Sequence, residues 1–346
     1  LFGWGTHDLI ERGSCPSPLW GRLRKAFGRP RFPQEAYGPQ TVFTLKRLRQ
    51  ALLNATDQMG LVCQRILEQE RWDLFLGVLG APHRAGHYLW DLSQVETEGL
   101  DIATHEALVH ALEDIYVACD KALARIVQRL PANAVMMVFA LHGMGPNTGW
   151  SDYGHRIAGR IQNDGKAAES KTGLLYQLRQ RIPWQITRQV TLMLPKKVTD
   201  RLVEFWSADM FDWSSTRHFP LPMDHAGYFR INLRGREPRG IVEPGEEYAR
   251  ACEDLREALH SFKDLETGLP IVKQILTIDE LGTADAPFGD YLPDVVAVWT
   301  DAISAMHSKG ITSERYGRIQ PENRSKLPSG RAGNHRAGGW VIASGP

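Results

Sequence analysis

Two short, continuously apolar runs, each preceded by a long amphipathic pattern, constrain the fold of this chain most. Residues 74–79 (LFLGVL) and 134–140 (AVMMVFA) have the length and composition of strands that are covered on both faces. Before them, residues 41–70 and 104–130 repeat apolar side chains at helical spacing. Helix, strand, helix, strand is typical of a doubly wound, mostly parallel sheet with helices on both faces, so we predict an α/β fold.

The α/β pattern stops after residue 150 and resumes at residue 227. The segment between them is polar, mostly basic and helical in its apolar spacing. We therefore predict three parts: an α/β core with the first metal-site loops at 1–150, a mainly helical cap insertion at 151–226, and the remainder of the core with a late histidine loop at 227–346. In the last part the sequence predicts strands at 227–233, 273–278, 294–299 and 340–343, and a helix at 246–262.

Histidines lie at the ends of the predicted strands. His83 and His87 follow the first strand, four residues apart and therefore on one side of a helical turn. His142 follows the second strand, and His335 lies in a glycine-rich loop before the last one. Ligands of such sheets bind beyond the carboxyl ends of the strands, and imidazole is a preferred zinc ligand. The alternative is a chance pair on a solvated turn, but two separate strand ends with histidine favour a metal site.

Charge and apolar runs exclude several classes of partner. The chain has 41 Lys and Arg against 40 Asp and Glu, a formal net charge of +1, so no overall field recruits a nucleic-acid duplex or an anionic membrane. A small anionic substrate fits this charge balance. No apolar run approaches the ~20 residues that span a bilayer. The four cysteines are far apart in the sequence, which favours buried thiols and a reducing compartment such as the cytoplasm.

Four motifs, in this order, carry a resemblance to a known family. They are GAPHRAGH (80–87), LHGM (141–144), NLRGREPRGIVEPGEEY (232–248), and HRAGG (335–339) ahead of a strand that ends in SGP. Together they resemble the alkaline phosphatase superfamily, in particular its type I phosphodiesterase/nucleotide pyrophosphatase branch. The resemblance covers about residues 72–346 and implies an alkaline-phosphatase-like sheet and a hydrolase of phosphodiesters or phosphomonoesters.

The resemblance also implies metal ligands. His83, His87 and His335 match the positions that bind the first metal, and Leu141 with His142 match the pair that binds the second, so one or two divalent ions such as zinc are expected. The family usually has aspartate at the positions of His83 and Leu141. Imidazole replaces one ligand by another, whereas leucine removes a ligand. A mononuclear site, or a site reorganised around Asp152 or Asp224, is therefore an alternative.

Substrate contacts and the nucleophile are further implications of the resemblance. Arg84 and Arg336 lie beside the ligand positions, where a guanidinium can contact a phosphate oxygen or pair with a carboxylate. In the family, the Thr or Ser nucleophile lies on the first strand and the following helix. No segment before residue 41 has that pattern, so the nucleophile is expected upstream of Leu1 and the chain is expected to be the C-terminal part of an enzyme. A sulfatase, a phosphomutase, or a non-catalytic binding protein that has lost ligands are the alternatives.

Overall fold

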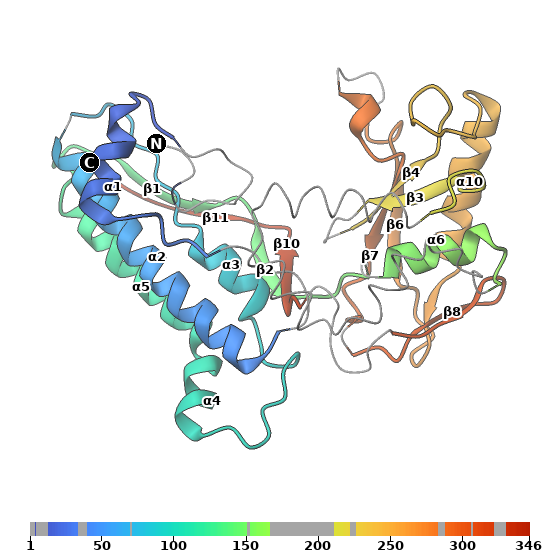
Figure 1. Ribbon diagram of the computed structural model, residues 1–346, viewed down its shortest axis with the longest axis horizontal. Coiled ribbons are helices and arrows are strands. Elements are labelled where there is room, and N and C mark those ends of the chain that lie inside the picture. Colours follow the sequence, from blue (N-terminus) through green and yellow to red (C-terminus); the bar gives the residue numbers. More distant parts are fainter. Residues whose placement is uncertain are drawn as a thin grey trace. The chain divides into compact units, whose positions relative to one another are not determined.

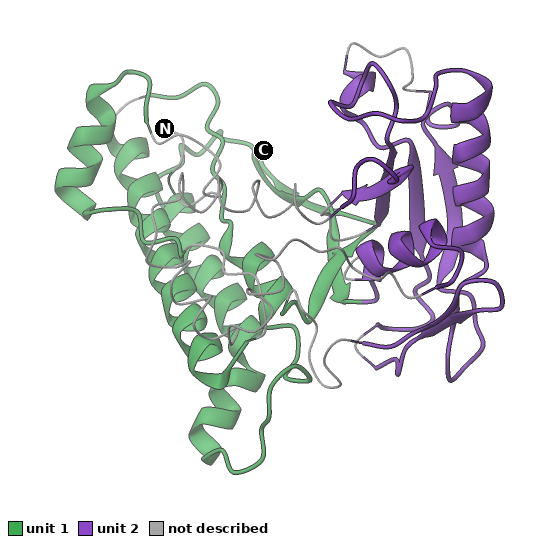
Figure 2. Ribbon diagram, turned by 45° about the vertical axis from the view of Figure 1, so that its right-hand side comes forward, with its two compact units in different colours: residues 1–147, 329–346 green, residues 148–328 purple. Residues whose placement is uncertain are grey.

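The chain divides into two compact units. Unit 1 comprises Leu1–Asn147 and Ser329–Pro346, and unit 2 comprises Thr148–Pro328 (Figure 2). The three-part division at residues 150 and 226 stays a prediction, and much of the expected helical cap lies outside the described residues. The computed structural model describes residue 4 and residues 13–33, 40–69, 71–150, 153–166, 211–221, 226–282, 288–305, 307–321 and 330–346.

Two long helices, α2 (Val42–Gln69) and α5 (Ala111–Val127), pack side by side and form the body of unit 1 (Figure 1). The helix predicted at 41–70 is confirmed, and it runs without a break through Gly60. A side chain at Gly60 would place its Cβ 2.9 Å from the Cβ of Ala122, so glycine at this position permits the close approach of the two helices.

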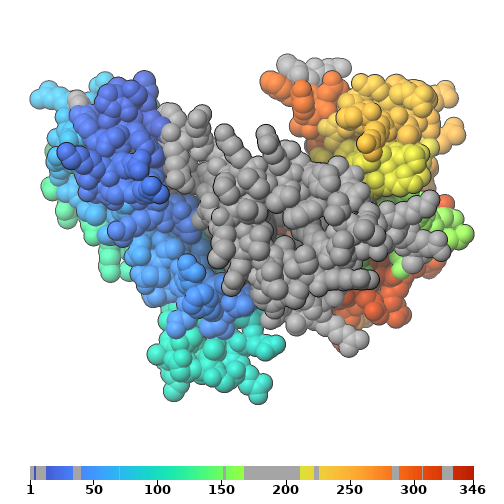
Figure 3. Space-filling model, viewed as in Figure 1, coloured from blue at the N-terminus to red at the C-terminus, as the bar shows by residue number. Residues whose placement is uncertain are grey.

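The helix predicted at 104–130 is two helices. α4 (Ile102–Val109) ends at Val109, and α5 begins at Ala111, with His110 as the cap residue between them. The Asp101 carboxylate caps α4 by accepting a hydrogen bond from the Thr104 amide at 2.8 Å. A shorter helix, α1 (Pro18–Phe27), precedes α2, and the helical surface of this unit is seen in blue and cyan in Figure 3. The apolar stripes of the helices meet in a core of Leu45, Leu52, Ala85, Tyr88, Leu108, Ala111 and Ile115.

The strand predicted at residues 74–79 is wrong. These residues belong to no named strand, and the side chains of Leu74, Leu76 and Val78 are 72%, 78% and 60% exposed. A run of apolar side chains indicates where a strand can form, but a strand also needs a neighbour to complete its hydrogen bonds. No strand in the described residues pairs with this segment.

The strand predicted at 134–140 is confirmed as β1 (Met136–Ala140), and the last strand is confirmed as β11 (Trp340–Ser344). They pair with each other in antiparallel register, as do β2 (Gly143–Pro146) and β10 (Gly333–Arg336). The doubly wound parallel sheet is not confirmed, because the named strands of the described residues pair only antiparallel. The mixture of helices and small sheets agrees with the α/β class.

One face of the β1–β11 pair is apolar and exposed. Phe139 lies opposite Val341 and Met137 opposite Ala343, so their side chains project to the same side. Met137, Phe139 and Val341 are 60%, 54% and 58% exposed, and Leu141 beyond the strand is 85% exposed. Apolar side chains with alternate positions on one face normally pack against another layer, which the described residues do not supply here.

Unit 2 is built on a four-stranded antiparallel sheet in the order β3-β4-β7-β6, and α10 (Glu246–His260) packs on this sheet. The predicted helix at 246–262 is thus confirmed, as are the predicted strands β4 (Gly227–Ile231), β6 (Val272–Thr277) and β7 (Val295–Trp299). The other elements of this unit are α6 (Gly154–Gln162), β3 (His218–Leu221), a 3-10 helix (Gly289–Tyr291) and a small sheet of β5 (Lys263–Asp264), β8 (Ile311–Ser313) and β9 (Gly317–Ile319).

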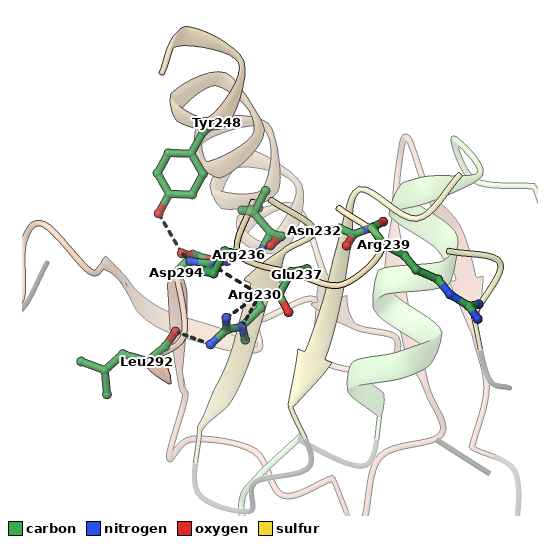
Figure 4. A network of polar contacts seen from close by, with 9 residues as sticks. Arg230, Asn232, Arg236, Glu237, Arg239, Tyr248, Leu292 and Asp294 are labelled. Carbon is green, nitrogen blue, oxygen red and sulfur yellow. Dashed lines mark hydrogen bonds and ion pairs between the residues drawn. The ribbon is translucent and has the colours of Figure 1, made fainter. Parts of the chain in front are cut away.

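A buried carboxylate, Asp294, joins the loop after β4 to the sheet of unit 2 (Figure 4). It accepts two hydrogen bonds from the Arg236 guanidinium, at 2.7 and 2.6 Å, and one from the Tyr248 hydroxyl at 2.8 Å. The Ile231 amide donates a fourth bond at 2.6 Å. Burial and the neighbouring Asp294 raise the pKa of Tyr248, so the phenol stays a donor. The GREP segment of the third motif therefore serves as an anchor for this loop.

Three of the four cysteines are buried, and the helices are not of the membrane-spanning kind among the described residues. Cys63, Cys119 and Cys252 are free and buried, as predicted, and burial raises the pKa of each thiol to about 11. Of the helices that the structure describes, none has the length and apolar character to cross a membrane.

Candidate metal centre

The short helix α3 (Ala81–Tyr88) carries the first two histidines of the site. Pro82 lies in its first turn, where the missing amide hydrogen costs no helical hydrogen bond. His83 and His87 are one turn apart, as the spacing predicted, and their ring centroids are 4.9 Å apart. Most of the helix is buried, and His87 is only 3% exposed. The packing of α3 therefore fixes the direction in which both imidazoles point.

The β2–β10 pair brings a third histidine, from the far end of the sequence, to α3. His335 lies on β10 opposite Met144 of β2, and β10 contacts α3. This contact depends on glycine. A Cβ at Gly333 would lie 2.0 Å from the carbonyl oxygen of Gly86, so only glycine lets the strand and the helix approach this closely.

Three imidazoles converge on one point. The Nε2 atom of His83 lies 3.1 Å from Nε2 of His87 and 3.0 Å from Nε2 of His335. The three ring centroids form a nearly equilateral triangle with sides of 4.9, 5.0 and 4.9 Å. Within the described residues, these are the His, Cys, Asp or Glu side chains that come together as a group able to hold a metal ion.

His142 lies next to this triad without belonging to it. Its ring centroid is 4.2 Å from that of His335 and 5.5 Å from that of His83. Its Nδ1 atom lies 3.0 Å from the carbonyl oxygen of Gly143. The structure thus gathers all four predicted histidines in one place, with three sharing a common centre and the fourth at its edge.

The surroundings of His87 keep its imidazole neutral. Burial lowers the pKa of His87 to about 2, and the nearby Arg331 guanidinium adds to the effect. Nδ1 of His87 lies 3.0 Å from the carbonyl oxygen of Gly333, which can only accept a hydrogen bond, so Nδ1 carries the proton. The lone pair is then on Nε2, the atom that faces the other two histidines. This is the protonation state that a metal ligand requires.

The triad fits a zinc ion. In tetrahedral coordination with Zn–N bonds of 2.0–2.1 Å, neighbouring ligand nitrogens lie roughly 3.3 Å apart. The distances from His83 to the other two Nε2 atoms are within a few tenths of an ångström of that value. The hydrogen bond from His87 to a backbone carbonyl is the usual outer partner of a metal-binding histidine. Three nitrogen ligands leave a fourth position for water or substrate, as in catalytic zinc sites.

The two arginines predicted to contact substrate make contacts within the protein. The Arg84 guanidinium is buried, donates a hydrogen bond to the Pro33 carbonyl and lies over the ring of Phe32 at 4.8 Å. Arg336 donates to the Pro146 carbonyl. Both guanidinium groups thus donate to backbone carbonyls of the protein, and their role toward substrate stays a prediction.

Leu141, at the position where a second metal would need a carboxylate, is 85% exposed directly after β1. Its side chain makes no contribution to a core. The two aspartates considered as substitutes, Asp152 and Asp224, lie outside the described residues.

Sequence reasoning missed the residues that orient the ligands. It selected histidines and arginines by their chemistry, whereas the group that contacts Nδ1 of His87 is the backbone carbonyl of Gly333. The one signal in the sequence for this contact was the glycine-rich composition of residues 330–339. It indicated that the backbone approaches another segment closely, but it did not show that this segment is α3.

Comparisons with known proteins agree with the motifs. The family model described as "Type I phosphodiesterase / nucleotide pyrophosphatase" matches residues 19–322. This range includes α3 and the 232–248 motif and ends before β10. The searches of curated proteins and of solved structures gave no match.

Proposed function

Because the chain belongs to the type I phosphodiesterase/nucleotide pyrophosphatase family, a family of phosphate-ester hydrolases, we propose that it contributes the metal site of a metal-dependent hydrolase of phosphate esters. His83, His87 and His335 are the proposed ligands of one divalent ion, and zinc is the ion that suits three imidazoles. The convergence of their three Nε2 atoms is the observation that carries this proposal.

Each part of the site has a role in this chemistry. When bound, zinc supplies charge neutralisation at the phosphoryl oxygens, which is most of what phosphoryl transfer needs. The Gly333 carbonyl holds the His87 ring in the orientation that a ligand needs. Arg336 and Arg84 are proposed to contact phosphate oxygens beside the ligands. The histidines act as ligands and take no part in proton transfer.

The nucleophile is proposed to lie outside residues 1–346, on a segment upstream of Leu1. The sequence pattern before residue 41 does not predict a strand and helix of the kind that carries the nucleophilic hydroxyl in this family. The chain would then bind a phosphate group through its metal without completing the transfer of that group. An aspartate ligand and a Thr or Ser encoded upstream of Leu1 support the enzyme, and their absence supports a binding protein.

We expect the zinc-loaded chain to bind AMP and to leave bis(p-nitrophenyl) phosphate unhydrolysed. Calorimetric titration should give AMP binding at least about tenfold tighter than that of the His335→Ala variant, since the metal contact to phosphate is then lost. Adenosine, which lacks the phosphate, is the matched control and should not bind. Equal AMP binding with and without zinc would contradict a metal-dependent site, and rapid hydrolysis would contradict a nucleophile upstream of Leu1.

Leu141→Asp is expected to tighten the binding of a second metal, because it restores a carboxylate at a ligand position. The side chain at this position is exposed, so the exchange costs the fold little, and a carboxylate would stand beside His142. Titration with excess zinc, which also detects sites too weak to survive dialysis, should show the stoichiometry rising from about one zinc per chain toward two. Leu141→Asn, with the same shape and a weaker ligand, is the control. Unchanged stoichiometry in Leu141→Asp would count against the assignment of this position.

A binding protein that has kept the fold is the second candidate function. The leucine at position 141 favours it, because an apolar side chain at a ligand position is expected where selection for a second metal has ended. Binding of AMP by a natural full-length protein that lacks turnover would identify this case.

A further inference from the structure

Asn147 holds the loop that leads into β10. Its side-chain amide donates a hydrogen bond to the carbonyl of Arg331 at 3.0 Å, and its backbone amide donates to the carbonyl of Ala332 at 2.8 Å. The residue is 7% exposed, so water competes little for these bonds. Two consecutive carbonyls immediately before Gly333 are therefore fixed by one residue, which itself follows directly on β2.

The next carbonyl in the loop is the one that contacts the metal site. Gly333 presents its carbonyl oxygen 3.0 Å from Nδ1 of His87. Gly333 lies close against Gly86 of α3 and pairs with Pro146 of β2, and the residues before it fix the direction in which the chain enters this contact. Asn334 then accepts a hydrogen bond from the His335 amide at 2.8 Å, two residues beyond Gly333. If this loop were displaced, two groups would move together: the ligand His335, and the Gly333 carbonyl that contacts His87.

We propose that Asn147 is a positioning residue of the histidine triad. It fixes the Arg331–Ala332 carbonyls, these fix the Gly333 carbonyl, and that carbonyl sets the tautomer and the ring orientation of His87. An amide is required because the Arg331 carbonyl needs a donor, which an aspartate of the same shape does not offer. The zinc-affinity test of this inference rests on the proposed function. The test by the tautomer of His87 is independent of the proposed function.

The test compares zinc affinity in Asn147→Asp, Asn147→Ala and the wild-type chain, by competition with a chromogenic chelator. Removal of an outer partner of a metal ligand typically lowers affinity about 10- to 100-fold, and since Asn147 positions that partner rather than being it, we expect a loss at the lower end, about tenfold, for both variants. Gln58→Ala is the matched control, since Gln58 is also buried in unit 1 and its amide donates to the carbonyls of Phe27 and Arg29, at 2.8 and 3.0 Å. It should lower stability and leave zinc affinity within twofold.

A second readout uses the metal-free chain. Nitrogen-15 NMR of the histidine rings at neutral pH should show His87 with its proton on Nδ1 in the wild type and a mixture of tautomers in the Asn147 variants. Wild-type zinc affinity in a folded Asn147→Asp variant, or a wild-type His87 with its proton on Nε2, would overturn the inference. A wild-type chain that binds no zinc would instead remove the metal from the proposed function, and the tautomers would still decide the role of Asn147.

Discussion

Replacing His87 by alanine is expected to abolish metal binding, from about one zinc per purified wild-type chain to none. His87 is the most buried member of the triad, and its neutral imidazole directs Nε2 at the other two rings. With two histidines left, the site has too few protein ligands to hold zinc against solvent. Elemental analysis of both proteins after dialysis against a weak chelator measures the difference.

His110→Ala is the control for this experiment. His110 is an exposed histidine in the same unit, between α4 and α5, and contacts Glu113. Its removal should leave the zinc content unchanged. Zinc retained by His87→Ala at the wild-type level would show that the triad is not the site, and the metal part of the proposed function would then be withdrawn.

Arg236→Met is expected to lower the free energy of unfolding by about 3–5 kcal/mol, because removal of one partner leaves a buried charge uncompensated. The Arg236 guanidinium is 12% exposed and Asp294 is fully buried. Burial by itself lowers the pKa of Arg236, but the bonds and charges of Asp294 and Glu237 outweigh it and raise the pKa. After the exchange, the hydrogen-bond donors that Asp294 retains among the described residues are the Tyr248 hydroxyl and the Ile231 amide.

Arg234→Met, two residues away, is the matched control. Arg234 pairs with Glu243 at 3.0 Å, but both side chains are more than half exposed, and such a pair contributes about 0–1 kcal/mol. Urea unfolding of the two variants, followed by tryptophan fluorescence, should therefore separate them by at least about 2 kcal/mol. Similar midpoints for both would mean that the network in Figure 4 contributes little to stability.

Local patterns predicted the long helices and the strands β1, β4, β6, β7 and β11, but not the shorter strands β2, β3, β5, β8, β9 and β10. The spacing of His83 and His87 depends only on the helical repeat, so their common side of α3 followed from the sequence. The same holds for α2 and α10, whose apolar stripes are long. The structure of residues 74–79 could not be predicted in this way. The length of an apolar run indicates that a strand can form, but it does not indicate which neighbouring strand would complete its hydrogen bonds.

Long-range pairing was the other part that local patterns did not predict. The partner of β1 is β11, about 200 residues further along the chain, and the antiparallel direction of this pair changes the expected sheet. His335 was selected by its resemblance to a family motif. Its distance of 3.0 Å from His83 depends on the β2–β10 pairing and on the glycine contact between β10 and α3. These contacts join residues that are far apart in the sequence, and the local sequence around one does not predict the other.

The bare apolar face of β1 and β11 has a consequence for the protein in bulk solution. Exposure of the apolar surface of Met137, Phe139 and Val341 to water costs free energy, roughly 25 cal/mol for each Å². Salts such as ammonium sulfate, which strengthen this effect, will therefore precipitate the chain early. With a formal net charge of only +1, electrostatic repulsion between molecules adds little protection. The apolar face of this strand pair will thus contribute to early precipitation at high salt.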